Sequence, residues 1–167
     1  MTLFHGSYCE VKSPAVMHGR DKVDFGRGFY LTELRDQAVA WARIVARRHP
    51  NAVAILNAYE FDVDLARTLA GSRYKIFPAY DLEWLDYVVD CRKGGALQSR
   101  YDLVEGGVAN DNVIDTVELY ENGDITAEQA LGQLAYKKVN HQTVVLNQRI
   151  VDKCLRFRGS EEVPDAQ

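Results

Sequence analysis

The sequence predicts an α+β domain, with strands at both ends of the chain and helices inserted between them. Runs of apolar and β-branched residues lie near the start, at 1–5, and near the end, at 142–146. Between them, several segments repeat apolar residues every three or four positions, which is the period of an amphipathic helix. Because strands and helices do not alternate regularly, a doubly wound parallel sheet is not expected.

Local signals place the individual elements in chain order. Thr32 is a suitable N-cap for a helix that runs to about Arg48 and stops before Pro50. The other predicted helices are 65–69, 79–91, 112–122, 127–134 and a short one at 148–154. The predicted strands are 1–5, 28–32, 52–61, strand ends at 103–104 and 108 around a Gly-Gly pair, 142–146 and 155–157.

The size and composition of the chain suit one compact domain. With 167 residues and a hydrophobic content of 47%, the chain can bury a core of its own. We expect a single domain over residues 1–159, followed by a polar, disordered tail over residues 160–167.

Charge, cysteine content and hydropathy exclude several classes of protein. The formal net charge of −4 argues against a large nucleic-acid footprint and leaves room only for a local basic patch. Cys9, Cys91 and Cys154 are odd in number and far apart, so we expect reduced thiols and no metal site. The sequence has no signal-peptide pattern and no run of about 18 apolar residues. We therefore expect a cytoplasmic protein that does not associate with membranes.

Two glycine-containing motifs carry the functional signal. The first, at residues 3–7, is Leu-Phe-His-Gly-Ser, and the second, at residues 24–32, is Asp-Phe-Gly-Arg-Gly-Phe-Tyr-Leu-Thr. Glycines let a backbone approach a ligand closely, and the adjacent His5 and Tyr30 can hydrogen-bond and stack a flat polar molecule. The first motif alone is weak, because a histidine beside a glycine is more often structural. The second is stronger, although a hairpin with a core tyrosine is its ordinary interpretation.

The motifs together resemble the NAD-binding signature of ADP-ribosyltransferases of the diphtheria-toxin and poly(ADP-ribose) polymerase type. In that family a His-Gly-Ser strand precedes a Phe-Gly-Lys-Gly-aromatic-Tyr segment, and a second aromatic residue follows on a helix. Here Arg27 stands in place of the lysine, and Trp41 lies eleven residues after Tyr30, as the second aromatic residue does in the family. Without this joint pattern, a lone Trp41 would be interpreted as a core residue. The resemblance implies an ADP-ribosyltransferase-like fold, which is a split mixed sheet around an NAD cleft with inserted helices.

The resemblance also implies roles for individual residues. The aromatic rings of Tyr30 and Trp41 would sandwich the nicotinamide ring, whose cationic form gains additional cation–π attraction. His5 would bind the adenosine ribose, and the backbone of Gly6 would pair with the carboxamide. The residues expected to contact NAD are His5, Gly6, Ser7, Arg27, Gly28, Phe29, Tyr30 and Trp41.

The third catalytic residue of the family is a glutamate, and the matching position here carries Gln142. In the family this glutamate accepts a hydrogen bond from the nicotinamide-ribose 2′-hydroxyl, and its charge stabilises the cationic transition state. Glutamine keeps the hydrogen bond but loses the charge, which typically costs about 3–4 kcal/mol, or about 10²–10³ in rate. The expected catalytic set is His5, Tyr30 and Gln142, which supports transfer of one ADP-ribose unit but not chain elongation.

The chain is also similar to an uncharacterised family of small bacterial proteins in the same clan, over most of residues 2–157. Those proteins share both motifs, a late glutamine and a Tyr-Asp-x-Val-x-Gly-x-Val-Ala-x-Asp segment, which lies here at 101–111. Gln142 is then a family trait. Asp102 and Asp111 in this segment are spare carboxylates, for which loop capping and turn hydrogen bonds are the more ordinary role.

Three functions are compatible with these residues. The first is an NAD-dependent mono-ADP-ribosyltransferase, which the resemblance associates with a bacterial toxin or effector and a neutralising antitoxin or inhibitor protein. The second is a catalytically weak or inactive module that binds NAD or ADP-ribose. The third, an NAD-dependent RNA 2′-phosphotransferase, is disfavoured because that branch carries histidine where Tyr30 stands and relies on basic residues. NAD is the expected substrate, and the sequence leaves open whether the acceptor is a protein or a nucleic acid.

Overall fold

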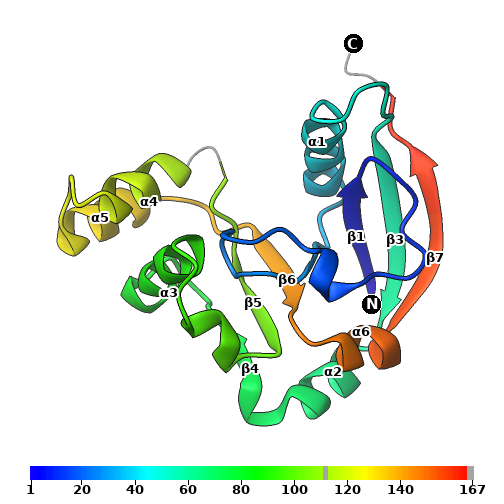
Figure 1. The fold of residues 1–167 in the computed structure, drawn as a ribbon. Helices are drawn as coiled ribbons and strands as arrows, with labels where there is room; N and C mark the ends of the chain where they lie inside the picture. The colour runs from blue at the N-terminus through cyan, green and yellow to red at the C-terminus, as the bar shows by residue number, and fades with distance from the viewer. Residues whose placement is uncertain (111–112, 165–167) are drawn as a thin grey trace.

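The computed structural model describes residues 1–110 and 113–164, which form two β-sheets with helices around them (Figure 1). The strands are β1 (Thr2–Ser7), β2 (Phe29–Leu31), β3 (Ile55–Phe61), β4 (Tyr74–Ile76), β5 (Leu103–Gly107), β6 (His141–Val145) and β7 (Leu155–Glu162). The first sheet has the order β1–β3–β7 and is antiparallel. The second has the order β2–β6–β5–β4, in which the β4–β5 pair is parallel and the others are antiparallel. The expected α+β class is confirmed.

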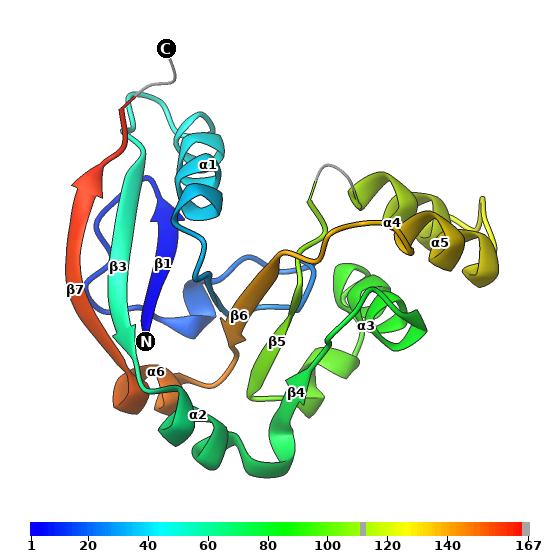
Figure 2. The same ribbon diagram turned by 180° about the vertical axis from the view of Figure 1, so that it is seen from behind.

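The helices cover the two sheets from different sides. Within the described residues they are α1 (Arg35–Ala46), α2 (Val63–Ala70), α3 (Leu82–Arg92), α4 (Ile114–Glu121), α5 (Ala127–Leu134) and α6 (Gln148–Cys154). Both views show α3, α4 and α5 gathered beside β4 and β5, whereas α1 lies beside β1 (Figures 1 and 2). α2 and α6 contact each other at the end of the molecule opposite α1.

Local caps agree with the predicted start of α5 and disagree with that of α1. Thr126 and Gln129 form a reciprocal capping box at the start of α5. The Thr32 hydroxyl instead accepts a hydrogen bond from the N–H of Leu34, and α1 begins at Arg35 without a side-chain cap. The predicted capping role of Thr32 is therefore wrong, and packing rather than capping sets the start of α1.

A glycine lets α1 lie directly on β1. A Cβ on Gly6 would lie 2.1 Å from the carbonyl oxygen of Ala38 and 2.6 Å from the amide nitrogen of Ala42. Ala38, Ala42 and Ala46 form the buried face of the helix. Small residues on both elements thus allow the two backbones to approach closely, and this contact fixes α1 above the strand that carries His5.

One pair of backbone hydrogen bonds joins the two sheets. The N–H of Phe4 donates to the carbonyl of Thr32 at 2.8 Å, and the N–H of Thr32 donates back to the carbonyl of Phe4 at 3.0 Å. β1 and β2 therefore lie side by side, although they come from different sheets. The junction brings the first sequence motif against the second.

Residues 160–162, which were expected to be disordered, belong to strand β7. β7 continues to Glu162, which pairs with the first residue of β3. The N–H of Val163 then donates to a backbone carbonyl just before β3 at 2.8 Å, and its side chain is buried. The expected disorder over residues 160–167 is wrong for residues 160–163, because ladder pairing and one apolar contact order a polar segment. Residues 165–167 lie outside the described part of the chain.

Both faces of β6 are buried, which makes this strand central to the molecule. Val144 belongs to an aromatic core that includes Phe25 and lies between the second sheet and α3, α4 and α5. Its neighbour Val145 belongs to a second core, which includes Leu3. Because side chains alternate along a strand, Gln142 lies on the same face of β6 as Val144.

Candidate functional site

His5 lies in β1 at the junction of the two sheets. Its Nδ1 is 2.8 Å from the carbonyl oxygen of Tyr30, and its ring lies against the ring of Phe29 at 4.4 Å between centroids. A carbonyl can only accept, so Nδ1 carries the proton. Burial lowers the pKa of His5, so the imidazole is neutral at pH 7. Its Nε2 is then a hydrogen-bond acceptor without a partner among the described residues.

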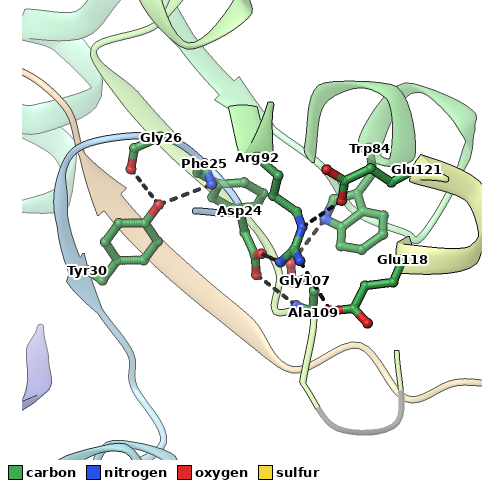
Figure 3. A network of polar contacts seen from close by, with 10 residues as sticks. All are labelled: Asp24, Phe25, Gly26, Tyr30, Trp84, Arg92, Gly107, Ala109, Glu118 and Glu121. Carbon is green, nitrogen blue, oxygen red and sulfur yellow. Dashed lines mark hydrogen bonds and ion pairs between the residues drawn. The ribbon is translucent and has the colours of Figure 1, made fainter. Parts of the chain in front are cut away.

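Tyr30 uses its hydroxyl within the protein. The hydroxyl donates to the carbonyl of Gly26 at 2.6 Å and accepts from the N–H of Phe25 at 3.0 Å, so it holds the turn that precedes β2 (Figure 3). Burial raises the pKa of Tyr30 well above its usual value, so the hydroxyl stays protonated at physiological pH. Any contact of Tyr30 with a ligand therefore uses the ring.

Gln142 lies at the start of β6 and is 8% exposed. Its Nε2 is buried and has no hydrogen-bond partner among the described residues. A buried amide group left unpaired costs about 1–3 kcal/mol. Tyr30 pairs across the ladder with Val144, two residues after Gln142, so Tyr30 and Gln142 share one face of the sheet as diagonal neighbours.

The three predicted catalytic residues lie on the adjoining strands β1, β2 and β6. His5 donates to the backbone carbonyl of Tyr30, and Tyr30 pairs with Val144, two residues after Gln142, in the β2–β6 ladder. The two atoms without partners, His5 Nε2 and Gln142 Nε2, are an acceptor and a donor. A ligand with hydroxyl groups satisfies both, because each hydroxyl donates and accepts.

The turn before β2 is shaped by close packing on both sides. Gly26 has φ +84°, and a Cβ there would lie 2.1 Å from Gln98 Oε1. A Cβ on Gly28 would lie 2.7 Å from Val144 Cγ1, so this glycine lets the chain lie against β6. The glycines of the second motif thus serve the packing of the protein itself, as Gly6 does in the first.

The remaining residues expected to contact NAD occupy different surroundings. Phe29 is buried, and its ring contacts Tyr59 edge-on at 5.6 Å between centroids. Ser7 is also buried, with its Oγ 3.8 Å from Cys9 Sγ. Trp41 is 41% exposed on α1. Phe29 therefore supports the site from the core, whereas Trp41 presents its ring to solvent.

A pocket of about 530 Å³ lies at the far end of β6 from Gln142. Its walls are Asp21, Arg27, Arg73, Gln98, Ser99, Tyr101, Asp102 and Leu146. Arg27 and Arg73 each face a carboxylate, at 3.4 Å from Asp21 and at 3.0 Å from Asp102. Arg27 therefore lines this pocket rather than the region around His5, and Asp102 belongs to an ion pair. Asp111 lies outside the described residues.

Sequence reasoning missed the network that holds the second motif in place (Figure 3). Asp24 accepts a hydrogen bond from the N–H of Ala109 at 3.1 Å and contacts Arg92 at 3.4 Å. Arg92 also pairs with Glu118 and Glu121 on α4. Burial raises the pKa of Asp24, while Ala109 and Arg92 partly offset this effect. The network ties the turn to α3 and α4, and the sequence gives no signal for it because its members are far apart in the chain.

A second buried amide was also missed. Gln37, in the first turn of α1, has a buried Oε1 without a hydrogen-bond partner among the described residues. The sequence offers no signal, since a glutamine on a helix is usually an ordinary surface residue. Gln37 Oε1 is an acceptor that lacks a donor.

The described residues contain neither a cluster of metal-ligand side chains nor a membrane-spanning helix. No group of three His, Cys, Asp or Glu side chains in residues 1–110 and 113–164 is arranged to hold a metal ion. None of the helices in these residues combines the length and the apolar composition that crossing a bilayer requires.

The fold and the site together define an α+β protein with a polar, incompletely satisfied site where its two sheets meet. Residues 1–157 match the family model described as protein of unknown function (DUF3990). The chain belongs to this family. No match was found among curated proteins or among solved structures.

Proposed function

We propose that this protein is an NAD-dependent mono-ADP-ribosyltransferase built on an ADP-ribosyltransferase-like split sheet. The observation that carries the proposal is the placement of a neutral His5, of Tyr30 and of the unpaired Gln142 amide on the adjoining strands β1, β2 and β6. The two motifs that resemble the family signature are the segments that form this junction. An NAD molecule offers the hydroxyls and the flat ring that this set of groups lacks.

Each residue has a defined task in this proposal. His5 Nε2 accepts a hydrogen bond from a ribose hydroxyl, and the proton on Nδ1 keeps the ring in that tautomer. The Tyr30 ring stacks on nicotinamide, with Trp41 on α1 as the second ring. Gln142 binds the 2′-hydroxyl of the nicotinamide ribose, which both donates and accepts and so suits either amide atom.

The reaction exchanges one bond at the ribose carbon C1′. The bond from C1′ to the nicotinamide nitrogen breaks, and nicotinamide leaves as a neutral molecule with the bonding electron pair. A lone pair of the acceptor forms the new bond to C1′, and the acceptor proton passes to water. Because Gln142 is neutral, it orients the ribose without stabilising the developing cation, so we expect slow turnover.

A binding module that does not turn NAD over is the second candidate. The observation that favours it is the neutral amide of Gln142 in the place of a carboxylate. Calorimetry with NAD and the rate of nicotinamide release separate the two candidates. Binding with release supports the transferase, binding without release supports the module, and absence of binding contradicts both.

The role of Gln142 is tested by two substitutions at equal NAD saturation. We expect Gln142→Ala to abolish nicotinamide release with little change in NAD affinity. We expect Gln142→Glu to raise release by up to about 10²-fold, because the charge acts mainly in the transition state. Thr143→Ala, on the opposite face of β6, is the control and should keep the parent rate. A parent-like rate in Gln142→Ala would show that Gln142 has no catalytic role.

A further inference from the structure

The pocket at the Leu146 end of β6 has two arginines and two aspartates in its walls. Arg27 lies in the turn before β2 and Arg73 lies just before β4, so the two guanidinium groups come from distant parts of the chain. Asp21 and Asp102 face them at 3.4 Å and 3.0 Å. We call this pocket of about 530 Å³ the arginine pocket. Its volume falls in the range of about 300–1,000 Å³ that is usual for small-molecule sites.

Two neighbouring residues hold both arginines in position. The Oε1 of Gln98 accepts a hydrogen bond from the backbone N–H of Arg27 at 3.1 Å. The carbonyl of Ser99 accepts one from Nη2 of Arg73 at 2.7 Å. In the part of the chain that the structure describes, Nε and Nη1 of Arg27 and Nη1 of Arg73 have no partner. The arginine pocket therefore presents two positioned guanidinium groups with N–H donors left for a ligand.

Stability alone does not account for the ion pair at the mouth of the arginine pocket. The side chains of Arg27 and Asp21 are 49% and 50% exposed, and ion pairs at such exposure contribute little to stability. A guanidinium group is well suited to phosphate, because its planar fork donates two parallel hydrogen bonds to the phosphate oxygens. Two arginines in the walls of one pocket therefore favour a phosphate as the anionic group of its ligand.

The two aspartates limit which phosphates fit the arginine pocket. A carboxylate repels a bare anion, but it accepts hydrogen bonds from the hydroxyl groups of a sugar. Inorganic phosphate would meet this repulsion without bringing sugar hydroxyls. Tyr101 and Leu146 add an aromatic and an aliphatic wall, against which a flat ring can pack. The ring of Tyr101 is itself in contact with that of Tyr87, at 5.6 Å between centroids.

We propose that the arginine pocket binds a nucleoside monophosphate. The two arginines hold its phosphate, the two aspartates accept hydrogen bonds from its ribose hydroxyls, and its base packs on Tyr101. The same chemistry occurs in a free nucleotide and in the terminal nucleotide of a phosphorylated nucleic acid. This site is separate from the proposed NAD site and does not depend on the proposed function. Leu146 follows Gln142 by four residues of extended chain, which is about 13 Å.

Calorimetry with uridine 5′-monophosphate, uridine and inorganic phosphate tests the class of ligand. Uridine is the chosen nucleoside because NAD contains adenosine. We expect the monophosphate to bind at least about tenfold more tightly than either part alone, since only the whole molecule satisfies the arginines and the aspartates together. No binding of the monophosphate, or equal affinity for uridine or for inorganic phosphate, would overturn the proposal. A 5′-phosphorylated oligouridylate that binds more tightly than the free nucleotide identifies the end of a nucleic acid as the source, and the reverse order identifies a free nucleotide.

Arg73→Gln tests the place of binding, and Arg67→Gln is the matched control. Arg73 and Arg67 are 47% and 43% exposed, and their carboxylate partners, Asp102 and Glu105, are 17% and 15% exposed. Both substitutions remove one ion pair of this kind, so thermal melting should show similar small changes. We expect only Arg73→Gln to raise the Kd of uridine 5′-monophosphate, by about tenfold or more, while Arg67→Gln stays within about twofold of the parent. Arg73→Lys, which keeps the charge without the planar fork, should bind with intermediate affinity.

The outcomes separate this site from the proposed function. Equal weakening by Arg73→Gln and Arg67→Gln would overturn the arginine pocket as the place of binding, as would parent-like affinity in both Arg73 variants. We expect Arg73→Gln to bind NAD with the affinity of the parent. A loss of NAD affinity as large as the loss of nucleotide affinity would overturn the separation of the two sites. A parent that binds uridine 5′-monophosphate through Arg73 but binds no NAD contradicts the proposed function and leaves the arginine pocket standing.

Discussion

At the scale of single residues, Tyr30 has two separable parts. Its hydroxyl is bound to Gly26 and Phe25 and belongs to the architecture of the turn. Its ring shares a face of the second sheet with Gln142 and is the part that a ligand can use. The same division applies to His5, whose Nδ1 holds the backbone of β2 while Nε2 remains unpaired. In both residues one polar contact fixes the orientation of the group that is proposed to meet the ligand.

The buried His5 makes stability depend on pH. Folding lowers its pKa below the usual value of 6.5, so the unfolded chain binds a proton first as the pH falls. The contribution of His5 to stability is therefore present above about pH 6.5 and is lost as the pH falls through the folded-state pKa, by at most about 1.4 kcal/mol per pH unit. Urea unfolding between pH 5 and 8 should show a shallower decrease in His5→Gln than in the parent. An unchanged slope in His5→Gln would contradict the prediction.

At the scale of elements, the contact between α1 and β1 depends on Gly6. The methyl group of an alanine there would overlap the backbone of α1 at Ala38 and Ala42, and backbone cannot move aside as a flexible side chain can. We expect Gly6→Ala to reduce the free energy of unfolding by about 1–3 kcal/mol, and to displace α1 together with Trp41. Calorimetry measures the first effect, and under the proposed function weaker NAD binding reports the second.

The matched control is a glycine where a methyl group meets nothing. Gly132 lies in α5, and a Cβ there has no neighbour within 4 Å. Alanine also favours helical backbone over glycine, so Gly132→Ala should raise the unfolding free energy by about 0.5–1 kcal/mol. If Gly6→Ala and Gly132→Ala both lower the unfolding free energy, the effect at Gly6 does not come from close packing.

At the scale of the whole molecule, the last strand closes the first sheet. Arg35 on α1 pairs with Glu161 on β7, and Arg43 donates to the carbonyl of Pro164, so the end of the chain also binds the helix that covers β1. This last segment therefore contacts both β3 and α1, which are the two elements beside β1, the strand that carries His5.

Truncation tests whether this segment belongs to the domain. Ending the chain after Gly159 removes the last ladder pairs of β7 and the buried Val163. We expect a loss of at least about 2 kcal/mol of unfolding free energy, measured by urea unfolding. Equal stability of the truncated chain and the parent would instead support a domain that ends at residue 159.

The sequence by itself determined the α+β class, the strands that carry both motifs and the helix that begins at residue 127, because these depend on local periodicity. It also singled out His5, Tyr30 and Gln142. Two predictions were wrong where contacts between residues far apart in the chain determine the structure. Thr32 does not cap α1, and β7 continues to Glu162.

Only the tertiary structure decided what the motif residues contact. The glycines proved to be packing positions, since the helix and side chains that press on them come from other parts of the chain. The links between Asp24 and Arg92 and between Arg27 and Asp21, and the unpaired amides of Gln37 and Gln142, follow from how the elements meet. Local propensity sets which segments become strands and helices, but the partner of a buried polar atom is chosen by residues that no short sequence window contains.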